Sequence, residues 1–196
     1  MHRAAGGTLD LKPLYAYAYM CAGNKLGALG LLLSDALERA TGDLSPSAAA
    51  LLLTLFYSPN TTATEGAKIA GIRQPTVVRV LDGLVRQGFV KREGRRGRTT
   101  VLCITRAGRQ RARLLQTARL EAMNDLLRAL GNPERIAFEQ AVDTLLGAAT
   151  TCRAFGRTTC RLCDHTICVG RLCPIGTRAT EIEQVAAKAK QRGQAC

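Results

Sequence analysis

The sequence has 196 residues, which is enough for one domain with an appendage, and 46% of them are hydrophobic, so the chain can bury a core. Its formal charge is +13, with 28 Lys and Arg against 15 Asp and Glu, which favours an anionic partner such as nucleic acid or a membrane surface. The most apolar runs, residues 26–33 and 48–56, are much shorter than the roughly 20 residues that cross a bilayer, so no membrane span is expected.

The first long helix is predicted over residues 9–41, where apolar side chains recur at helical spacing. Gly23, Gly27 and Gly30 lie inside it, although each costs a helix about 1 kcal/mol relative to alanine. Glycines at this spacing indicate that another helix packs closely against them. That helix belongs either to a second copy of the chain or to the same subunit. Residues 1–44 are therefore assigned to an N-terminal dimerisation helix.

Three shorter segments with helical signals follow. Residues 45–57 begin with a Ser-Pro cap and are almost wholly apolar, which predicts a buried helix. Residues 62–71 begin with the spacing of a capping box and end at a glycine. Residues 75–88 begin with a proline and again end at a glycine. Two short helices separated by a turn predict a helix-turn-helix.

The periodicity changes after residue 88 and predicts a β-hairpin. Residues 89–92 and 99–105 have the character of short strands. Residues 93–98 between them contain two glycines and three arginines, which predicts a loop with a strongly positive field. A basic hairpin placed directly after a helix-turn-helix indicates a wing, and we expect a winged helix-turn-helix domain over residues 45–105.

Polar residues at the start of the 75–87 helix are candidates for reading DNA bases. A helix that enters the major groove presents its first residues to the base edges, where Arg pairs with guanine and Gln with adenine. Arginines on a narrow hairpin fit the minor groove, whose negative potential attracts them. An ordinary solvated surface would explain these charges but not their position after the second helix. The predicted DNA-contacting residues are Arg73, Gln74, Thr76, Arg79, Arg92, Arg95, Arg96 and Arg98.

The rest of the chain is predicted to contain helices and a cysteine-rich segment. Residues 106–130 and 133–152 have helical patterns, and residues 106–155 are assigned to C-terminal dimerisation helices. The chain from residue 153 to residue 178 is expected to be irregular, and residues 156–178 are assigned to a cysteine-rich metal module. Residues 179–196 are polar and rich in alanine, and predict a terminal helix or tail.

The order of these elements and two segments resemble the MarR family of bacterial transcriptional regulators, over roughly residues 10–150. The segments are IRQPTVVRVLDGLVRQGFVKR (72–92) and RRGRTTVLCITRAGR (95–109), which includes a Thr-x-x-Gly step from Thr105 to Gly108. The resemblance implies a mostly α fold with a small β-hairpin wing, long intertwining N- and C-terminal helices, a homodimer and a double-stranded palindromic operator. It also implies that Asp82 braces a wing arginine through a salt bridge. The family wing usually has an Asp before its Arg pair, whereas Glu93-Gly94 precedes Arg95 here.

Four cysteines lie within 14 residues near the C-terminus, namely Cys160, Cys163, Cys168 and Cys173. The sequence begins without a secretion signal, so we expect a cytoplasmic protein with reduced thiols. A tetrahedral zinc ion binds four thiolates, and its binding can order a segment that lacks a core. Four cysteines ending in Cys-Pro are also found in iron–sulfur proteins. One metal centre per subunit is therefore expected beside the dimerisation helices, with zinc preferred to an iron–sulfur cluster.

The thiols also allow a role without metal. A redox switch, in which the four thiols form disulfides under oxidant, is the third interpretation of the cluster. Some MarR-family members have a similar Cys-Arg-x-Cys-Asp segment ending in Cys-Pro. Cys21 and Cys103 lie among apolar neighbours and are expected in the core.

The function that these features favour is a DNA-binding transcriptional regulator, a repressor that responds to metal, redox state or a small aromatic effector. An enzyme is not indicated, because no nucleophile–base pair, phosphate-binding loop or carboxylate pair is present. The alternative is an RNA-binding or ribosome-associated protein with a zinc-knuckle-like segment. Only 4% of the residues are aromatic, whereas RNA readers use aromatic side chains to stack bases.

Overall fold

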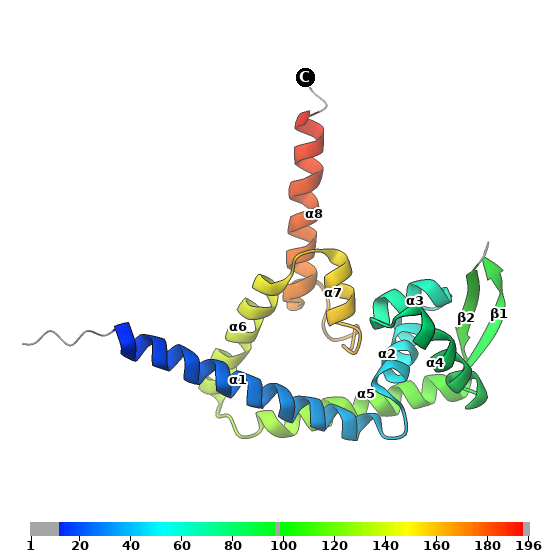
Figure 1. The fold of residues 1–196 in the computed structure, drawn as a ribbon, viewed down its shortest axis with the longest axis horizontal. Coiled ribbons are helices and arrows are strands. Elements are labelled where there is room, and N and C mark those ends of the chain that lie inside the picture. Colours follow the sequence, from blue (N-terminus) through cyan, green and yellow to red (C-terminus); the bar gives the residue numbers. More distant parts are fainter. Residues whose placement is uncertain (1–11, 97–98, 194–196) are drawn as a thin grey trace, which may run out of the picture.

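Helices make up most of the chain in the computed structural model, which describes residues 12–96 and 99–193 (Figure 1). The elements in chain order are α1 (Lys12–Thr41), α2 (Pro46–Tyr57), α3 (Ala63–Ala70), α4 (Gln74–Arg86), β1 (Val90–Arg96), β2 (Thr99–Ile104), α5 (Arg106–Leu127), α6 (Asn132–Ala149), α7 (Arg153–Thr159), the 3₁₀ turn η1 (Gly170–Leu172) and α8 (Pro174–Gly193). The antiparallel pair β1–β2 completes the predicted fold class, which is confirmed. Of the described helices, none has the length and apolar character needed to cross a membrane.

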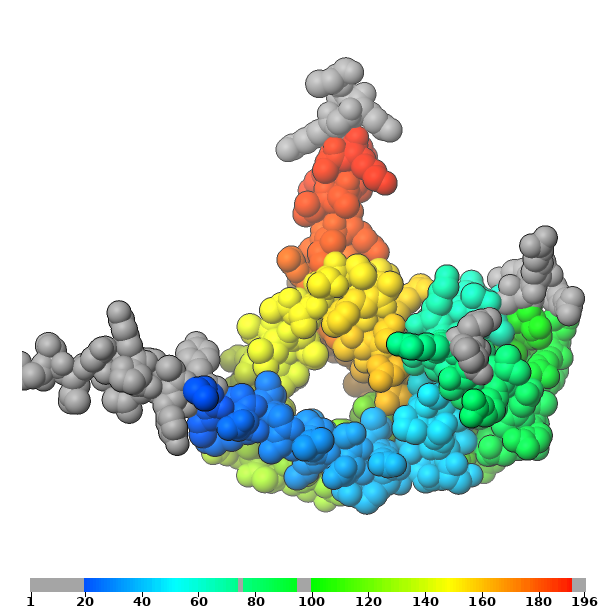
Figure 2. Space-filling model, viewed as in Figure 1, coloured from blue at the N-terminus to red at the C-terminus, as the bar shows by residue number. Residues whose placement is uncertain are grey.

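The helices α1 and α5 lie side by side and form the long base of the molecule (Figure 1). At one end of this base, α2, α3, α4 and the hairpin gather into a winged-helix unit. The helix α6 leads from the other end to α7, and α8 projects away from the rest of the molecule. In the space-filling view an opening separates α1 from α6 and α7 (Figure 2).

The hydrophobic core lies in the winged-helix unit and is centred on α2. Ser45 caps this helix by accepting a hydrogen bond from the backbone N–H of Ala48, and Pro46 holds its first position. Every residue from Ala48 to Leu55 is buried, because α3, α4, α5 and β2 all pack against α2. The buried residues that these four elements and β1 contribute are Ala67, Ala70, Val77, Leu81, Leu84, Val90, Leu102, Ile104, Ala112 and Leu115.

The joint between the hairpin and α5 explains the Thr-x-x-Gly step of the sequence. The Thr105 hydroxyl accepts a hydrogen bond from the backbone N–H of Gly108 at 3.0 Å and donates one to the carbonyl of Gly88 at 2.7 Å. A side chain at position 108 would overlap the carbonyl oxygen of Phe89. The cap and the missing side chain together fix the angle between the wing and α5.

Within the described part of one chain, nothing covers the face of α1 that carries its glycines. A Cβ atom added to Gly23, Gly27 or Gly30 would meet nothing within 4 Å. The interpretation that a helix of the same subunit packs on these glycines is therefore wrong. Cys21 is exposed on the same helix, so its expected place in the core is also wrong for the single chain.

The hairpin has longer strands than the sequence predicts. Strand β1 continues to Arg96, so most of the segment expected as a loop (residues 93–98) is strand. The register shifts between Arg92 and Arg95, where Gly94 adopts a φ of +67°. A bulge takes up an extra residue in one strand, and glycine readily adopts the positive φ that this one needs. The two strands can therefore continue to pair beyond it.

The cysteine-rich segment is more regular than predicted. The Sγ atom of Cys152 accepts a hydrogen bond from the backbone N–H of Phe155 and so caps α7 within a stretch expected to be irregular. The last helix, α8, begins at Pro174, so the expected boundary between residues 178 and 179 falls inside it. Proline is favoured at the first position of a helix, and Pro174 therefore starts α8 as well as ending the cysteine motif.

Candidate nucleic-acid interface and cysteine module

The helix α4 has one face in the core and one face open to solvent. Val77, Leu81 and Leu84 are buried at the spacing of successive helical turns. Thr76 and Arg79, two of the predicted base-reading residues, are exposed in its first half. The helix therefore presents an accessible polar face beside a fixed apolar one.

Two other predicted residues lie at the start of α4. Arg73 is exposed at the N-cap position, and its side chain makes no capping hydrogen bond. Gln74 begins the helix, and its side chain lies outside the described part of the structure. The first turn of α4 thus carries residues 73, 74 and 76 at the end that reads bases when such a helix enters a major groove.

Val78 belongs to the exposed face of α4, although an apolar residue of this type is usually buried. Its side chain is 57% exposed. It follows Val77 directly, so it points away from the core that Val77, Leu81 and Leu84 enter. An exposed methyl group beside Thr76 and Arg79 can contact the methyl group of a thymine. The position of Val78 around the helix axis relative to the buried residues, rather than its residue type, identifies it as a candidate contact residue.

The wing is joined to α4 by an ion pair. The Arg92 guanidinium donates to the Asp82 carboxylate at 2.6 Å, and both side chains are about half exposed. This is the brace that the family resemblance implies for Asp82. That Arg92 contacts DNA stays a prediction, because Asp82 binds only its Nη2 atom and the side chain is about half exposed. A surface pair of this kind adds little stability, but it sets the orientation of β1 against α4.

Three predicted arginines lie at the far end of the wing. Arg95 and Arg96 belong to β1 and pair with Thr100 and Thr99 of β2. Their side chains, and Arg98 as a whole, lie outside the described residues. The hairpin lies beside α4 in Figure 1, so the backbone brings these positions to the same end of the molecule as the reading helix.

Glu93, the departure from the family pattern, is tied to both strands of the wing. Its carboxylate accepts hydrogen bonds from the Lys91 ammonium at 2.7 Å and from the Cys103 thiol at 2.6 Å. The hydrogen bond to this carboxylate raises the pKa of Cys103, so the thiol stays protonated. Cys103 is half-buried and paired with Glu93, rather than packed in the core as predicted.

The cysteine module (residues 156–178) docks on the winged-helix unit. The ring of Tyr57 in α2 stacks on His165, with centroids 5.0 Å apart and 15° between the planes. The Thr158 hydroxyl donates to the carbonyl of Lys68 in α3. With its amide oxygen turned toward the module, Gln116 of α5 accepts a hydrogen bond from the backbone N–H of Asp164 at 2.8 Å. The expectation that the module lies beside the dimerisation helices is therefore incomplete, because it also contacts α2 and α3.

The four predicted metal-ligating thiols lie close together and pair two by two. Cys160 and Cys163 influence each other's pKa, as do Cys168 and Cys173, and the Cys168 thiol donates to the carbonyl of Leu172 at 3.6 Å. The neighbouring Cys160 thiol, and then the guanidinium of Arg119, lower the pKa of Cys163 to about 6. Burial and the neighbouring Cys173 raise the pKa of Cys168 to about 11. Every cysteine in the described ranges is a free thiol, and nowhere in those ranges do three Cys, His, Asp or Glu side chains converge closely enough to hold an ion.

Arg119 is the basic group that faces these thiols from α5. Its Nε atom is buried and has no hydrogen-bond partner. An unsatisfied buried donor costs about 1–3 kcal/mol, and more when the group is charged. Sequence reasoning missed this residue because nothing in the 106–130 pattern distinguishes it from the other arginines of the helix.

Comparisons with known proteins agree with this geometry. A sequence model of the MarR family matches residues 44–95, and no curated protein matches the chain significantly. MepR, a transcription regulator of the Staphylococcus aureus multidrug efflux pump MepA, has a similar fold, with 18% identity, coverage of 68% of this chain and 97% of that chain, and a TM-score of 0.54. A MarR-family protein of Mycobacterium tuberculosis is 23% identical, with 63% and 92% covered and a TM-score of 0.54. The PcaV transcriptional regulator of Streptomyces coelicolor is 22% identical, with 63% and 96% covered and a TM-score of 0.52.

Proposed function

We propose that this chain is a DNA-binding transcription regulator of the MarR type, because a sequence model of that family matches its residues 44–95. It binds a palindromic operator as a homodimer and represses transcription. The observation that carries the proposal is the exposed face of α4, with Thr76, Val78 and Arg79 open to solvent beside a wing held by Asp82. The RNA-binding alternative has no support from the comparisons.

A second copy of the chain accounts for the apolar surface outside the winged-helix unit. Large hydrophobic side chains of α1 and α6 are exposed in the single chain, and the three glycines of α1 meet open space. A partner chain that covers these side chains would remove their apolar surface from water. The exposed hydrophobic residues of α1 and α6 are Met20, Leu26, Leu31, Leu32, Ile136, Phe138 and Leu145.

Selection of duplexes from a random pool tests the proposed operator. The full chain should enrich a two-fold symmetric site whose half-sites are about one helical turn apart, because two α4 helices in one dimer face successive major grooves. The Arg79→Ala variant should relax the preference at specific positions of that site, at a cost of about 1–3 kcal/mol. The matched control is Arg128→Ala, which removes an exposed arginine of the turn after α5. Enrichment of no sequence by the parent chain would contradict the proposal.

For the cysteine module, we propose one four-thiolate metal centre per subunit. The chemistry of the donor set supports such a centre, because four thiols influence one another within one short module and Gly176 donates its backbone N–H to the Cys173 sulfur at 3.2 Å. In the described structure they do not yet converge on one point. The buried Nε atom of Arg119, which has no hydrogen-bond partner, also supports this centre. A metal centre with four thiolates is anionic, and so could accept a hydrogen bond from this donor. Bringing the two thiol pairs onto one ion requires rotation of their side chains. Zinc remains preferred to an iron–sulfur cluster.

The Cys163→Ser variant tests the metal centre. Protein purified without oxygen should contain about one zinc per chain when colourless, or iron and acid-labile sulfide when brown, and the variant should lose that metal. Loss of a structural zinc should lower the thermal midpoint, whereas loss of a sensing cluster should change operator affinity in a folded dimer. A variant that holds metal as well as the parent chain would refute the site. Cys21→Ser, an exposed cysteine outside the module, is the control.

We propose further that a small aromatic ligand acts as an effector. The MarR-family protein of M. tuberculosis was also solved in complexes with p-aminosalicylic acid and with salicylic acid. An effector changes operator affinity only to the extent that it binds one arrangement of the two winged-helix units of the dimer better than another.

A further inference from the structure

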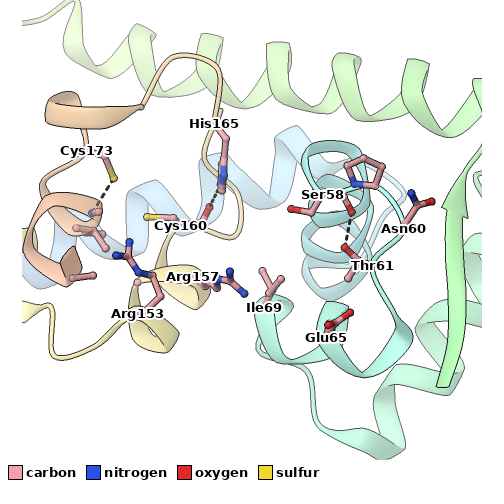
Figure 3. A pocket seen from close by; sticks show the side chains of 15 residues that line it. Ser58, Asn60, Thr61, Glu65, Ile69, Arg153, Arg157, Cys160, His165 and Cys173 are labelled. Atoms are coloured by element: carbon pink, nitrogen blue, oxygen red, sulfur yellow. Dashed lines mark hydrogen bonds between the residues drawn. The ribbon is translucent and has the colours of Figure 1, made fainter. Parts of the chain in front are cut away.

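A cavity of about 520 Å³ lies between the winged-helix unit and the cysteine module (Figure 3). One wall is formed by the turn 58–61 and by α3, and the other by α7 and the start of α8. Thr61 and Glu65 lie across the cavity from Cys160 and Cys173 in Figure 3. This volume is in the range of pockets that enclose small organic ligands.

Two arginines of α7 line the cavity, and they differ in what they contact. Arg153 is held by the Glu183 carboxylate at 2.6 and 3.1 Å and by the Thr180 hydroxyl at 2.8 Å. Arg157 makes no hydrogen bond or ion pair within the described ranges, and in Figure 3 its side chain extends toward Ile69. The charge of Arg157 helps to lower the pKa of Glu183, but that carboxylate is already bound by Arg153. An available guanidinium therefore faces the cavity.

The floor of the cavity is apolar. Ile175 and Ala179 of α8 line it and are only 5% and 1% exposed. Gly156 lets α7 approach this floor, because a Cβ atom there would lie 2.9 Å from Ile175. Ile69 adds an apolar side chain from α3. An apolar floor below a guanidinium matches a ligand that has an apolar body and one anionic group.

We propose that this cavity binds a small organic carboxylate, with Arg157 pairing with the carboxylate group and the apolar body resting on Ile175 and Ala179. Guanidinium and carboxylate match in geometry, since two parallel hydrogen bonds can form between them. A carboxylate at Arg157 lies within the cavity that α3 and the turn 58–61 enclose.

The effect of such a ligand on DNA rests on the proposed function. The cavity wall belongs to the DNA reader, because α3 is the first helix of the helix-turn-helix. The carbonyl of Thr61, in the turn 58–61, accepts a hydrogen bond from the backbone N–H of Leu102 in β2 at 3.2 Å. A ligand in the cavity therefore contacts elements that pack against α4 and bond to the wing, and it should shift operator affinity by roughly 5- to 150-fold.

Calorimetric titration of the full chain with benzoate tests the carboxylate site. Benzoate should bind in the micromolar to millimolar range that is usual for so small a ligand, and benzamide, its uncharged analogue, should bind at least about tenfold more weakly. Arg157→Gln should weaken benzoate binding at least about tenfold, and Arg157→Lys should fall between, because an ammonium keeps the charge without the two-pronged geometry. Arg171→Gln removes an exposed arginine outside the cavity and should bind like the parent chain. Thermal melting of each variant checks that it is folded.

Two results would overturn the proposal. They are no binding of benzoate or salicylate at millimolar concentration, and full affinity for benzoate in Arg157→Gln. A parallel operator titration keeps the two proposals separate. A chain that binds its operator but no carboxylate refutes only the cavity, and one that binds benzoate through Arg157 but no duplex refutes the regulator.

Discussion

At the residue scale, the geometry of the reader depends on a few positions where only one side chain fits. Gly108 is the strictest of them, because any side chain there would enter the space of the Phe89 carbonyl oxygen. Thr105 fixes the same joint through its cap of α5 and its bond to Gly88. These two residues hold the wing at its angle to α5, so the direction of the wing depends on them.

Gly108→Ala should destabilise the chain by more than about 2 kcal/mol, because the overlap is with backbone and cannot be relieved by rotation of a side chain. The matched control is Gly83→Ala in α4, where a Cβ atom meets nothing within 4 Å and alanine should stabilise the helix by up to about 1 kcal/mol. Urea unfolding of both variants measures the difference. Equal stability of Gly108→Ala and the parent chain would show that the joint is not rigid.

The Asp43–Arg111 pair predicts how stability depends on acidity. Hydrogen bonding to Arg111 and its charge hold the pKa of Asp43 below its ordinary value, and the same guanidinium donates to the Thr41 carbonyl at 2.8 Å. Because the pKa of Asp43 is lower in the folded state, the ionised carboxylate stabilises the fold at pH values above its unfolded pKa of about 3.9. This stabilisation is lost as the pH falls through the pKa of the folded state. Asp43→Asn should therefore lose a small part of the acid dependence of the unfolding midpoint below about pH 4. An unchanged acid profile would show that the pair does not contribute to stability.

At the scale of elements, the helices and the hairpin could be predicted wherever the signal is local. The caps at Ser45, Thr62 and Thr105 mark helix starts that the structure contains, since each cap bonds to the backbone two or three residues on. The contacts that dock the cysteine module could not be predicted. Tyr57 and His165 are distant in sequence, and only the packing of the whole chain brings them together.

The exposed side of α4 shows the same limit in one residue. Residue type alone places Val78 in the core with Val77, whereas the helical phase set by Val77, Leu81 and Leu84 leaves it in solvent. In the wing, the family resemblance implied an ion pair of Asp82, and the structure shows that its partner is Arg92.

The wing as an element should supply binding that does not depend on sequence. Replacing Arg95 and Arg96 with alanine should flatten the slope of log affinity against log salt by up to about 0.9 for each phosphate that is no longer neutralised. The preference among base pairs should change little, because phosphate contacts position the protein and base contacts specify the site. Fluorescence anisotropy over a range of salt concentrations measures the slope. A double variant with the parent's slope would show that the wing arginines do not contact phosphate.

At the scale of the whole molecule, the proposed dimer depends on the glycine face of α1. A Cβ atom at Gly27 meets nothing within 4 Å in the described residues, so Gly27→Ala should keep the monomer folded and add helix stability of up to about 1 kcal/mol. Dimerisation through this face should nevertheless weaken, because a second helix can no longer approach as closely. Light scattering over a dilution series measures the dimer fraction, with Gly83→Ala as the control. A dimer unaffected by Gly27→Ala would place the interface elsewhere.

The central claim is that two copies of the chain read one palindromic duplex, and the mass and affinity of the complex test it most directly. With the selected duplex, light scattering should give a complex of two chains per duplex. Anisotropy should give an affinity about 10³- to 10⁷-fold above that for a scrambled duplex of the same length and salt concentration. One chain per duplex, or equal affinity for the selected and the scrambled sequence, would contradict the account.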